Sequence, residues 1–211
     1  MATTTLDRLT KKLQREETRR KILRSAAQVF AAKGFHSAVV DDIVKASGTS
    51  KGAVYFYFES KEQIFLSLVE DFASSLAREI QGAVQRARGL VAQVEAAVAT
   101  LVRIFQADRD LAKIVLVDWP SVGAEFQGRR IALKAMLVEV LRGYLDRAVE
   151  DSKIAAQDTE TAAYVWIGAI SEVVLRWVNT GKPDPLEEVL APLTQLLLLS
   201  VGFAVSPAAS R

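Results

Sequence analysis

The chain has 211 residues, half of them apolar and a quarter charged, which provides ample material for a hydrophobic core. It contains no cysteine and a single histidine, His36, so a disulfide framework, a thiolate metal site and a cysteine nucleophile are excluded. Residues 1–20 are rich in threonine and then in charge, without the apolar core of a secretory signal, so we expect a cytoplasmic protein with no metal or cofactor.

Charge is unevenly divided along the chain, although the net charge is only +2. Residues 1–62 hold twelve Lys and Arg against seven Asp and Glu, a net charge of +5, and the remaining residues have a net charge of −3. A basic front and an acidic remainder indicate that the front binds a polyanion such as DNA.

The expected elements of the N-terminal part are an arm and three helices. Residues 1–16 are expected to form a flexible basic arm, followed by a helix over 17–33 that ends at Gly34 as its C-cap. Short helices are expected over 40–46 and 50–58, separated by Gly48. Ser60 and Gln63 have the spacing of a capping box that opens a long helix over 61–87.

The C-terminal part is also expected to be entirely helical, with segments at 90–107, 108–118, 126–151, 158–180 and 184–204. Asp158 and Asp184 are the expected N-caps of the last two helices, and Gly181 closes the first of them. The apolar stretch 189–205 is interrupted by Pro192 and Gly202 and is short for a bilayer span, so a buried helix is favoured over a membrane segment.

The predicted fold is therefore all-α, with about nine helices. We expect an N-terminal domain over 17–62, a helical C-terminal domain over 63–205, and a frayed tail over 206–211.

The two short helices around Gly48 have the lengths and the glycine-containing turn of a helix-turn-helix, whose second helix enters the major groove of DNA. Val54 and Phe58 lie four residues apart and are expected to face the core, whereas Lys51 and Tyr55 lie on another face. The small residues near the helix start leave room for base pairs to approach, and tyrosine hydroxyls suit phosphate oxygens. The competing interpretation is a small helical subdomain whose aromatic residues only fill a core.

A resemblance decides between these interpretations. The segment from Arg20 to about Val69 resembles the DNA-binding part of the TetR family of repressors. The residues that carry the resemblance are Ala26 to Phe30, Lys33-Gly34-Phe35, Asp42-Ile43, Ala46 to Phe58 and Ser60-Lys61-Glu62. The remainder of the chain shares only length and helix count with the family.

The resemblance implies that residues 50–57 form the recognition helix, that Tyr55 and Lys61 contact the DNA backbone, and that the basic residues before the first helix lie along DNA. The predicted DNA-binding residues are Ser50, Lys51, Gly52, Ala53, Tyr55, Tyr57, Lys61, Lys45, Thr49, Arg19 and Arg20. One departure is that Ala38 and Val39 replace the usual capping Thr or Ser, so we expect Ser37 or Asp41 to cap the second helix. His36 is expected to be an exposed turn residue rather than a phosphate contact or a pH sensor.

The resemblance also implies that the C-terminal part binds an inducer and that its last two helices form the dimer. Because the helix over 158–180 has two apolar faces, a second subunit can cover one of them. The predicted dimer residues are Trp166, Ile170, Val173, Trp177, Leu193 and Leu197. The predicted ligand-binding residues are Phe105, Leu116, Trp119, Phe126, Tyr164, Trp166 and Glu172, and their surroundings favour a small apolar or amphipathic ligand.

The function predicted from these features is a homodimeric repressor that binds a palindromic operator and is released by that ligand. We hypothesise that the ligand displaces the segment 108–118, tilts the helix that starts at Lys61, and changes the spacing of the recognition helices. One alternative is a DNA-binding protein of the same fold without an inducer, governed by a protein partner or acting on DNA architecture. An enzyme is not expected, because no catalytic motif is found.

Overall fold

The computed structural model describes residues 2–119, 122–123 and 126–203, with side chains from Thr10 onward except that of residue 118. Within these residues the secondary structure is entirely helical, which confirms the predicted fold class. Two compact units divide the chain, residues 1–72 and 73–211, and the predicted tail 206–211 lies outside the described residues.

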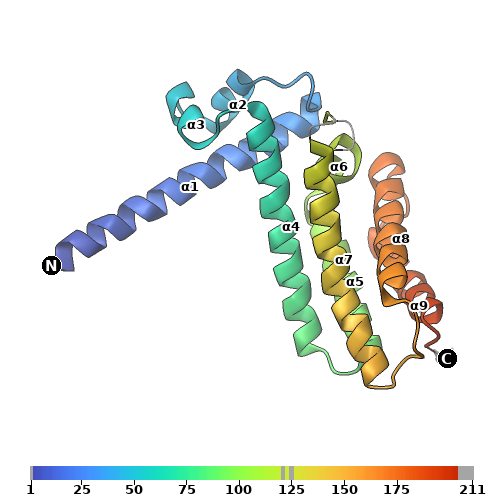
Figure 1. Cartoon of the computed structure of the whole chain (residues 1–211). Helices are drawn as coiled ribbons and strands as arrows, with labels where there is room; N and C mark the ends of the chain where they lie inside the picture. The colour runs from blue at the N-terminus through green and yellow to red at the C-terminus, as the bar shows by residue number, and fades with distance from the viewer. Residues whose placement is uncertain (1, 120–121, 124–125, 204–211) are drawn as a thin grey trace. The chain divides into compact units, whose positions relative to one another are not determined.

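The first unit contains α1 (Ala2–Lys33), α2 (Val40–Ser47), α3 (Lys51–Tyr57) and the first part of α4 (Lys61–Arg86). Figure 1 shows α2 and α3 as two short helices that follow the long α1. The helix α1 starts at Ala2, not at about Glu17, so the segment predicted as a flexible arm continues the helix. Lys11 to Glu16 are mostly strong helix formers, so propensity extends the helix where no apolar stripe marks it.

The core of this unit is built around three phenylalanines from α1, the following loop and α4. The rings of Phe30, Phe35 and Phe65 lie 5.0 to 5.7 Å apart, at the distances and tilts that favour edge-to-face contact. Each is buried, which stabilises the fold by about 1.5–3 kcal/mol per side chain. Ile22 of α1 and Ile43 of α2 are also fully buried, and α1 packs against α2.

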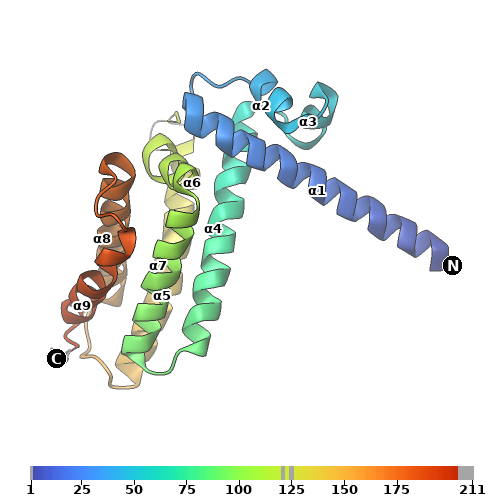
Figure 2. The same cartoon turned by 180° about the vertical axis from the view of Figure 1, so that it is seen from behind.

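The second unit contains the rest of α4, α5 (Leu90–Ala107), α6 (Arg109–Lys113), η1 (Ile114–Asp118), α7 (Gln127–Glu150), α8 (Thr159–Thr180), η4 (Leu186–Val189) and α9 (Leu190–Ser200). In Figure 1 α7 lies in front of α5, and in Figure 2, seen from behind, α5 lies in front of α7. The helix α7 packs against α8, and α5 packs against α9.

Most of the predicted helix ends in this unit agree with the structure, and two segments differ. Asp158 accepts a hydrogen bond from the Thr161 amide at 3.0 Å, and Gly181 ends α8 with a φ of 70°, as predicted. The predicted helix over 108–118 becomes a π-helical turn, η1, from Ile114 onward. The last helix begins as the 3-10 turn η4, without an Asp184 cap, and ends at Ser200 instead of about Ala204. Near its start, Pro192 has no amide N–H to donate to the Glu188 carbonyl.

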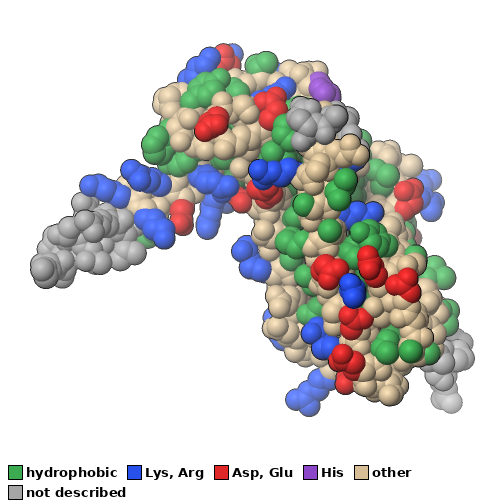
Figure 3. Space-filling model, in the orientation of Figure 1, with side chains coloured by type: hydrophobic (Ala, Val, Ile, Leu, Met, Phe, Trp, Pro, Cys, Tyr) green, Lys and Arg blue, Asp and Glu red, His purple; other side chains and the backbone are tan. Residues whose placement is uncertain are grey.

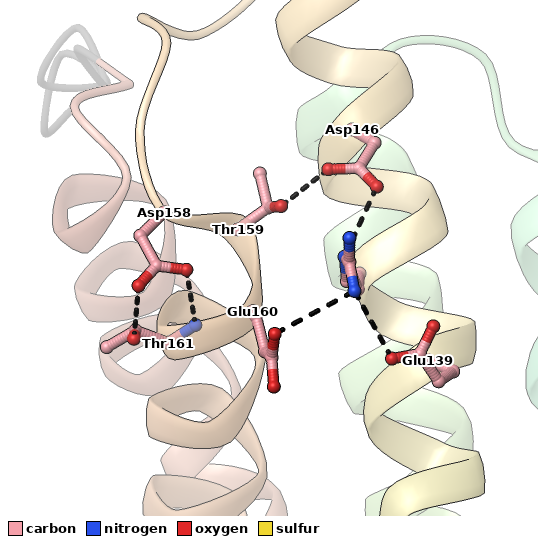
Figure 4. Close-up of polar contacts among 7 residues, drawn as sticks. Glu139, Asp146, Asp158, Thr159, Glu160 and Thr161 are labelled. Atoms are coloured by element: carbon pink, nitrogen blue, oxygen red, sulfur yellow. Dashed lines mark hydrogen bonds and ion pairs between the residues drawn. The ribbon is translucent and has the colours of Figure 1, made fainter.

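A polar network joins the packed helices α7 and α8. Arg142 of α7 lies 3.4 to 3.8 Å from carboxylate oxygens of Glu139, Asp146 and Glu160, the last of which belongs to α8 (Figure 4). Acidic side chains gather over this part of the unit in Figure 3. Because these groups are largely exposed, we expect the network to fix the helix register more than to add stability.

Among the described helices, α5 and α8 have the length and hydropathy of a membrane span, unlike the stretch at 189–205. Both helices supply core residues, including Val98 and Phe105 of α5 and Val174 of α8. Core helices of soluble proteins meet the same two criteria, so this finding does not indicate a membrane protein.

Candidate nucleic-acid interface

The turn between α2 and α3 is fixed by local chemistry. Gly48 adopts a left-handed φ of 59°, which a residue with a side chain adopts at a cost. The Ser47 hydroxyl lies 2.7 Å from that of Thr49, so the predicted DNA residue Thr49 is hydrogen-bonded within the turn. Ser50 caps α3 by accepting a hydrogen bond from the Ala53 amide at 3.1 Å.

The start of α2 is capped differently from the prediction. The Asp42 carboxylate accepts a hydrogen bond from the Val39 amide at 3.2 Å, so neither Ser37 nor Asp41 is the cap. Asp42 also forms an ion pair with Lys33 at 2.7 Å. The hydrogen bond from Lys33, followed by that from Val39, lowers the pKa of the Asp42 carboxyl below its ordinary value of 3.8. Asp42 therefore ties the start of α2 to the end of α1.

The helix α3 divides into a buried face and an exposed face, as its spacing predicts. Val54 and Phe58 are buried at 0% and 2% exposure, so they pack the helix against the core. Tyr55 is exposed at 46% and Phe56 at 67%, on a different side of the helix. Of the four aromatic side chains of this segment, Tyr55 and Phe56 are exposed, Tyr57 is half-buried, and only Phe58 is buried.

Gly52 lies near the start of α3, where a small residue has no packing reason within the chain. A Cβ atom built at this position would meet no other atom within 4 Å. Because a glycine weakens a helix relative to alanine, its presence here indicates a need for close approach by another molecule. Ser50 and Lys51 are exposed beside it, and Ala53 is half-buried.

The predicted DNA-binding residue Lys51 is paired within the chain. Its Nζ lies 2.8 Å from an Asp41 carboxylate oxygen, and both side chains are more than half exposed. The hydrogen bond with Asp41 raises the pKa of the Lys51 ammonium above its ordinary value. An exposed pair of this kind is weak and can exchange Asp41 for a phosphate.

Lys61 lies at the start of α4 and is engaged by the loop between α1 and α2. Its ammonium donates hydrogen bonds to the carbonyls of Phe35 at 2.8 Å, Ala38 at 2.9 Å and His36 at 3.3 Å. It also lies 4.4 Å from the centroid of the Phe35 ring. Lys61 therefore holds the loop to α4 in this structure, and its contact with DNA stays a prediction.

The cap of α4 is close to the predicted capping box but not identical to it. Ser60 accepts a hydrogen bond from the Gln63 amide at 3.2 Å, as the pattern predicts. The Gln63 side chain accepts a hydrogen bond from the Glu59 amide, one residue before the expected donor, the amide of Ser60. Both interactions satisfy amides at the start of the helix.

Basic residues of α1 extend the exposed surface of the unit, and Figure 3 shows basic side chains along this helix. The Arg15 guanidinium lies 5.8 Å from the centroid of the Phe56 ring. Arg19 is bound to Asp71, with one contact at 2.6 Å, and also lies over the Phe58 ring. Arg20 and the α2 residue Lys45 are exposed. Arg15, one of the basic residues before the expected first helix, thus lies next to α3, whereas Arg19 is paired with Asp71, an exposed residue of α4.

Sequence reasoning missed two residues of this surface, Phe56 and Asp41. Phe56 follows the predicted contact Tyr55, and the helical period alone places it away from Val54 and Phe58. Asp41 gives no sequence signal, because its pairing with Lys51 depends on the crossing of α2 and α3.

The predicted ligand-binding residues differ in burial, and their role in ligand binding stays a prediction. Phe105, Trp119 and Trp166 are buried, and Leu116 and Phe126 are half-buried, whereas Tyr164 and Glu172 are exposed on α8. The Trp166 indole donates to Ser200 at 2.9 Å, so it joins α8 to α9. Trp119, at the end of η1, has a buried Nε1 atom without a hydrogen-bond partner.

The predicted dimer residues are largely occupied within the chain. Trp166, Trp177, Leu193 and Leu197 are all less than 10% exposed, and Ile170 and Val173 are half-buried. The exposed large apolar side chains of α8 and α9 are a different set, Tyr164, Val165, Leu196 and Leu199. The apolar spacing thus identified two apolar faces of α8. Trp166, Trp177, Leu193 and Leu197 are buried within the chain, and their role in a dimer stays a prediction.

Comparison with known proteins assigns the chain to a family. Residues 22–68 match the family model of the bacterial regulatory proteins of the tetR family, and residues 88–201 match the tetracyclin repressor-like C-terminal domain. An uncharacterized HTH-type transcriptional regulator of Bacillus subtilis, YdgC, is 31% identical over 188 residues, covering 86% of this chain and 91% of the relative.

Two solved structures share the fold over almost their whole length. The fatty acid degradation regulator FadR from Bacillus halodurans has a TM-score of 0.83 and 25% identity, covering 89% of this chain and 97% of its own. The transcriptional regulator FadR from Bacillus subtilis, solved in complex with stearoyl-CoA, has a TM-score of 0.80 and 21% identity, covering 88% and 99%.

These comparisons support a ligand-responsive DNA-binding repressor, and the alternative of the same fold without an inducer is not favoured. The family consists of transcriptional regulators rather than enzymes. With both units matched, this chain belongs to the TetR family of helix-turn-helix transcriptional regulators.

Proposed function

We propose that the protein is a homodimeric repressor of the cytoplasm, without catalytic activity, that leaves a palindromic operator when it binds a long-chain acyl-CoA. The observation that carries the DNA-binding part is α3, whose buried Val54 and Phe58 leave Tyr55 and Phe56 exposed beside Gly52. The acyl-CoA part is supported by the named fatty acid regulator and the stearoyl-CoA complex among the structural neighbours.

In the proposed complex, α3 enters the major groove and Gly52 allows the backbone to approach the base pairs. Phe56 offers an apolar surface to a thymine methyl group, the base feature that apolar side chains recognise. Ser50, Ala53, Tyr55, Tyr57 and Lys51 surround this contact, with phosphates as partners for the hydroxyls and the ammonium. Lys45, Thr49, Lys61, Arg19 and Arg20 are proposed phosphate contacts at its edge, and Arg15 joins them because it approaches Phe56.

The proposed dimer surface is formed by the exposed apolar side chains of α8 and α9. Val165 is exposed at 54% and Leu196 at 64%, and Tyr164 and Leu199 are also exposed. Four large apolar side chains on two packed helices form the kind of surface that a second subunit covers. We expect Leu196→Glu to shift the protein from dimer to monomer in sedimentation, because pairing would bury two unpaired carboxylates. Glu188→Gln, on the exposed side of η4, is a control that leaves the dimer intact.

The acyl chain requires apolar surroundings, which the half-buried and buried residues of α5 and η1 supply. In the proposed mechanism the ligand moves η1 and alters α4, a continuous helix whose first twelve residues belong to the DNA-binding unit. The two recognition helices of a dimer must lie about one DNA turn apart, so a shift of a few ångströms weakens binding.

The test is a titration of the protein–DNA complex with stearoyl-CoA, followed by fluorescence anisotropy of a labelled duplex selected by the protein. Release at a ligand concentration that also shifts the thermal midpoint of the protein supports the proposal, since a ligand that binds the folded state stabilises it. Binding of stearoyl-CoA without any loss of DNA affinity would contradict the proposed induction, and coenzyme A without an acyl chain is the matched control.

A further inference from the structure

Trp119 carries an unsatisfied hydrogen-bond donor in the interior of the second unit. Its side chain is 7% exposed, and within the described residues its Nε1 is the one buried side-chain nitrogen or oxygen without a partner. The indole of Trp166, a residue that is 4% exposed, donates to Ser200 at 2.9 Å. Buried polar groups in folded proteins are nearly always hydrogen-bonded, so this unpaired N–H group indicates an acceptor from another molecule.

The backbone that leads to Trp119 is also unusual. The amide of Trp119 bonds to the carbonyl of Ile114, five residues earlier, which makes η1 a π-helical turn. Such turns are rare and frequently lie at functional sites, because the extra residue re-aims the following side chain. The orphaned donor and the π-turn are independent observations that coincide at one residue.

The two ends of the α6–η1 segment are held very differently. At its start, Asp108 caps α6 through the Leu111 amide at 2.9 Å. The adjacent Arg109 donates to the Trp177 and Val178 carbonyls at the end of α8, at 3.2 and 2.7 Å. At the other end, the Trp119 side chain makes no polar contact among the described residues. The Trp119 end of the α6–η1 segment is therefore the end that a ligand can bind through a hydrogen bond.

We infer that the Trp119 indole donates a hydrogen bond to the acyl carbonyl oxygen of the bound ligand, an inference that rests on the proposed acyl-CoA inducer. An indole N–H is a neutral donor with no acceptor capacity, so its partner must be an acceptor. Ile114 and Val122, whose backbones are hydrogen-bonded to that of Trp119, are buried and apolar. A neutral thioester carbonyl suits these surroundings better than a carboxylate, whose burial without a cation is costly. This contact fixes η1 when the ligand is bound.

The test pairs a variant with a change in the ligand. Stearoyl-CoA is compared with S-octadecyl-CoA, a thioether that lacks the carbonyl oxygen, by calorimetric titration of the full-length protein. We expect the wild type to bind the thioester about three- to ten-fold more tightly, the usual worth of one hydrogen bond. Trp119→Phe is expected to bind both with equal affinity, whereas the control Trp177→Phe keeps the preference.

The outcomes separate this inference from the function on which it rests. If the wild type binds neither compound, the acyl-CoA inducer itself is wrong. If it binds both equally, or if Trp119→Phe keeps the preference for the thioester, the role of Trp119 is overturned and the inducer stands. Should Trp119→Phe not fold, the wild-type indole proton resonance, assigned with Trp166→Phe and Trp177→Phe, decides. A downfield shift with stearoyl-CoA that is missing with the thioether supports the hydrogen bond, and equal shifts refute it.

Discussion

The hydrogen bonds of Lys61 to the loop between α1 and α2 give a prediction for stability whose magnitude follows from the structure. The Lys61 ammonium reaches three carbonyls of the loop that joins α1 to α2, and two of these, Phe35 and Ala38, are part-buried. In Lys61→Met the apolar stem remains and the donors are lost. The two part-buried carbonyls are then left without a partner, and the start of α2 loses its tie to α4.

The expected destabilisation is about 3.5 kcal/mol. A hydrogen bond from a charged donor contributes about 1.5–3 kcal/mol, and we take the lower value for each part-buried carbonyl because Lys61 is half-exposed. The cation–π contact with Phe35 at 4.4 Å adds about 0.5 kcal/mol. For a chain of this size the loss corresponds to a fall in Tm of about 7–14 °C.

Urea denaturation, read together with amide hydrogen exchange of the residues in the first unit, measures this effect even if the two units unfold separately. Lys45→Met is the matched control, because Lys45 is exposed on α2, and we expect its stability to change by less than about 0.5 kcal/mol. If Lys61→Met has the wild-type urea midpoint and wild-type amide exchange, the hydrogen bonds of Lys61 do not stabilise the fold. In that case, a slope of log DNA affinity against log salt concentration that is smaller by about 0.9 in the variant would assign Lys61 to a phosphate contact.

Three further predictions concern the same unit. Asp41→Asn should leave stability nearly unchanged, since the pair with Lys51 is exposed, and should raise the affinity for duplex DNA at low salt. If the slope of log DNA affinity against log salt concentration stays that of the wild type, Lys51 lies outside the interface. Gly52→Ala should stabilise α3 by about 0.5 kcal/mol and weaken operator binding, and a variant that gains stability without losing affinity would argue against close backbone approach. Because the pKa of Asp42 is lowered in the folded protein, its carboxylate stabilises the fold above pH 3.8, and this stability is lost as the pH falls through the pKa of the folded state. In Asp42→Asn the urea midpoint should therefore fall less steeply with decreasing pH than in the wild type. A decrease as steep as that of the wild type would contradict this role.

Features controlled by local chemistry could be predicted from the sequence. The four-residue spacing of Val54 and Phe58 predicts the buried face of α3 because helix geometry alone decides it. Asp158 and Gly181 are the caps of α8 for the same reason, since a short acceptor and a residue tolerant of positive φ act within one turn.

Features that depend on which surfaces meet could not be predicted. The apolar period of α8 shows two faces, but it does not tell whether Trp166 faces α9 or a second subunit, and the structure places it against Ser200. The start of α1 was missed because exposed Lys, Arg and Glu residues continue a helix through propensity without leaving an apolar stripe. The lone donor of Trp119 is likewise visible only when its surroundings are known.

The central claim, a dimeric regulator that reads a palindrome with α3, is tested most directly by selection from a library of random duplexes at stated salt. The account predicts recovery of a palindrome whose half-sites lie about one to one and a half DNA turns apart. Recovery of no common sequence, with binding that only follows salt concentration, would contradict it, because contact with phosphates alone carries no sequence preference.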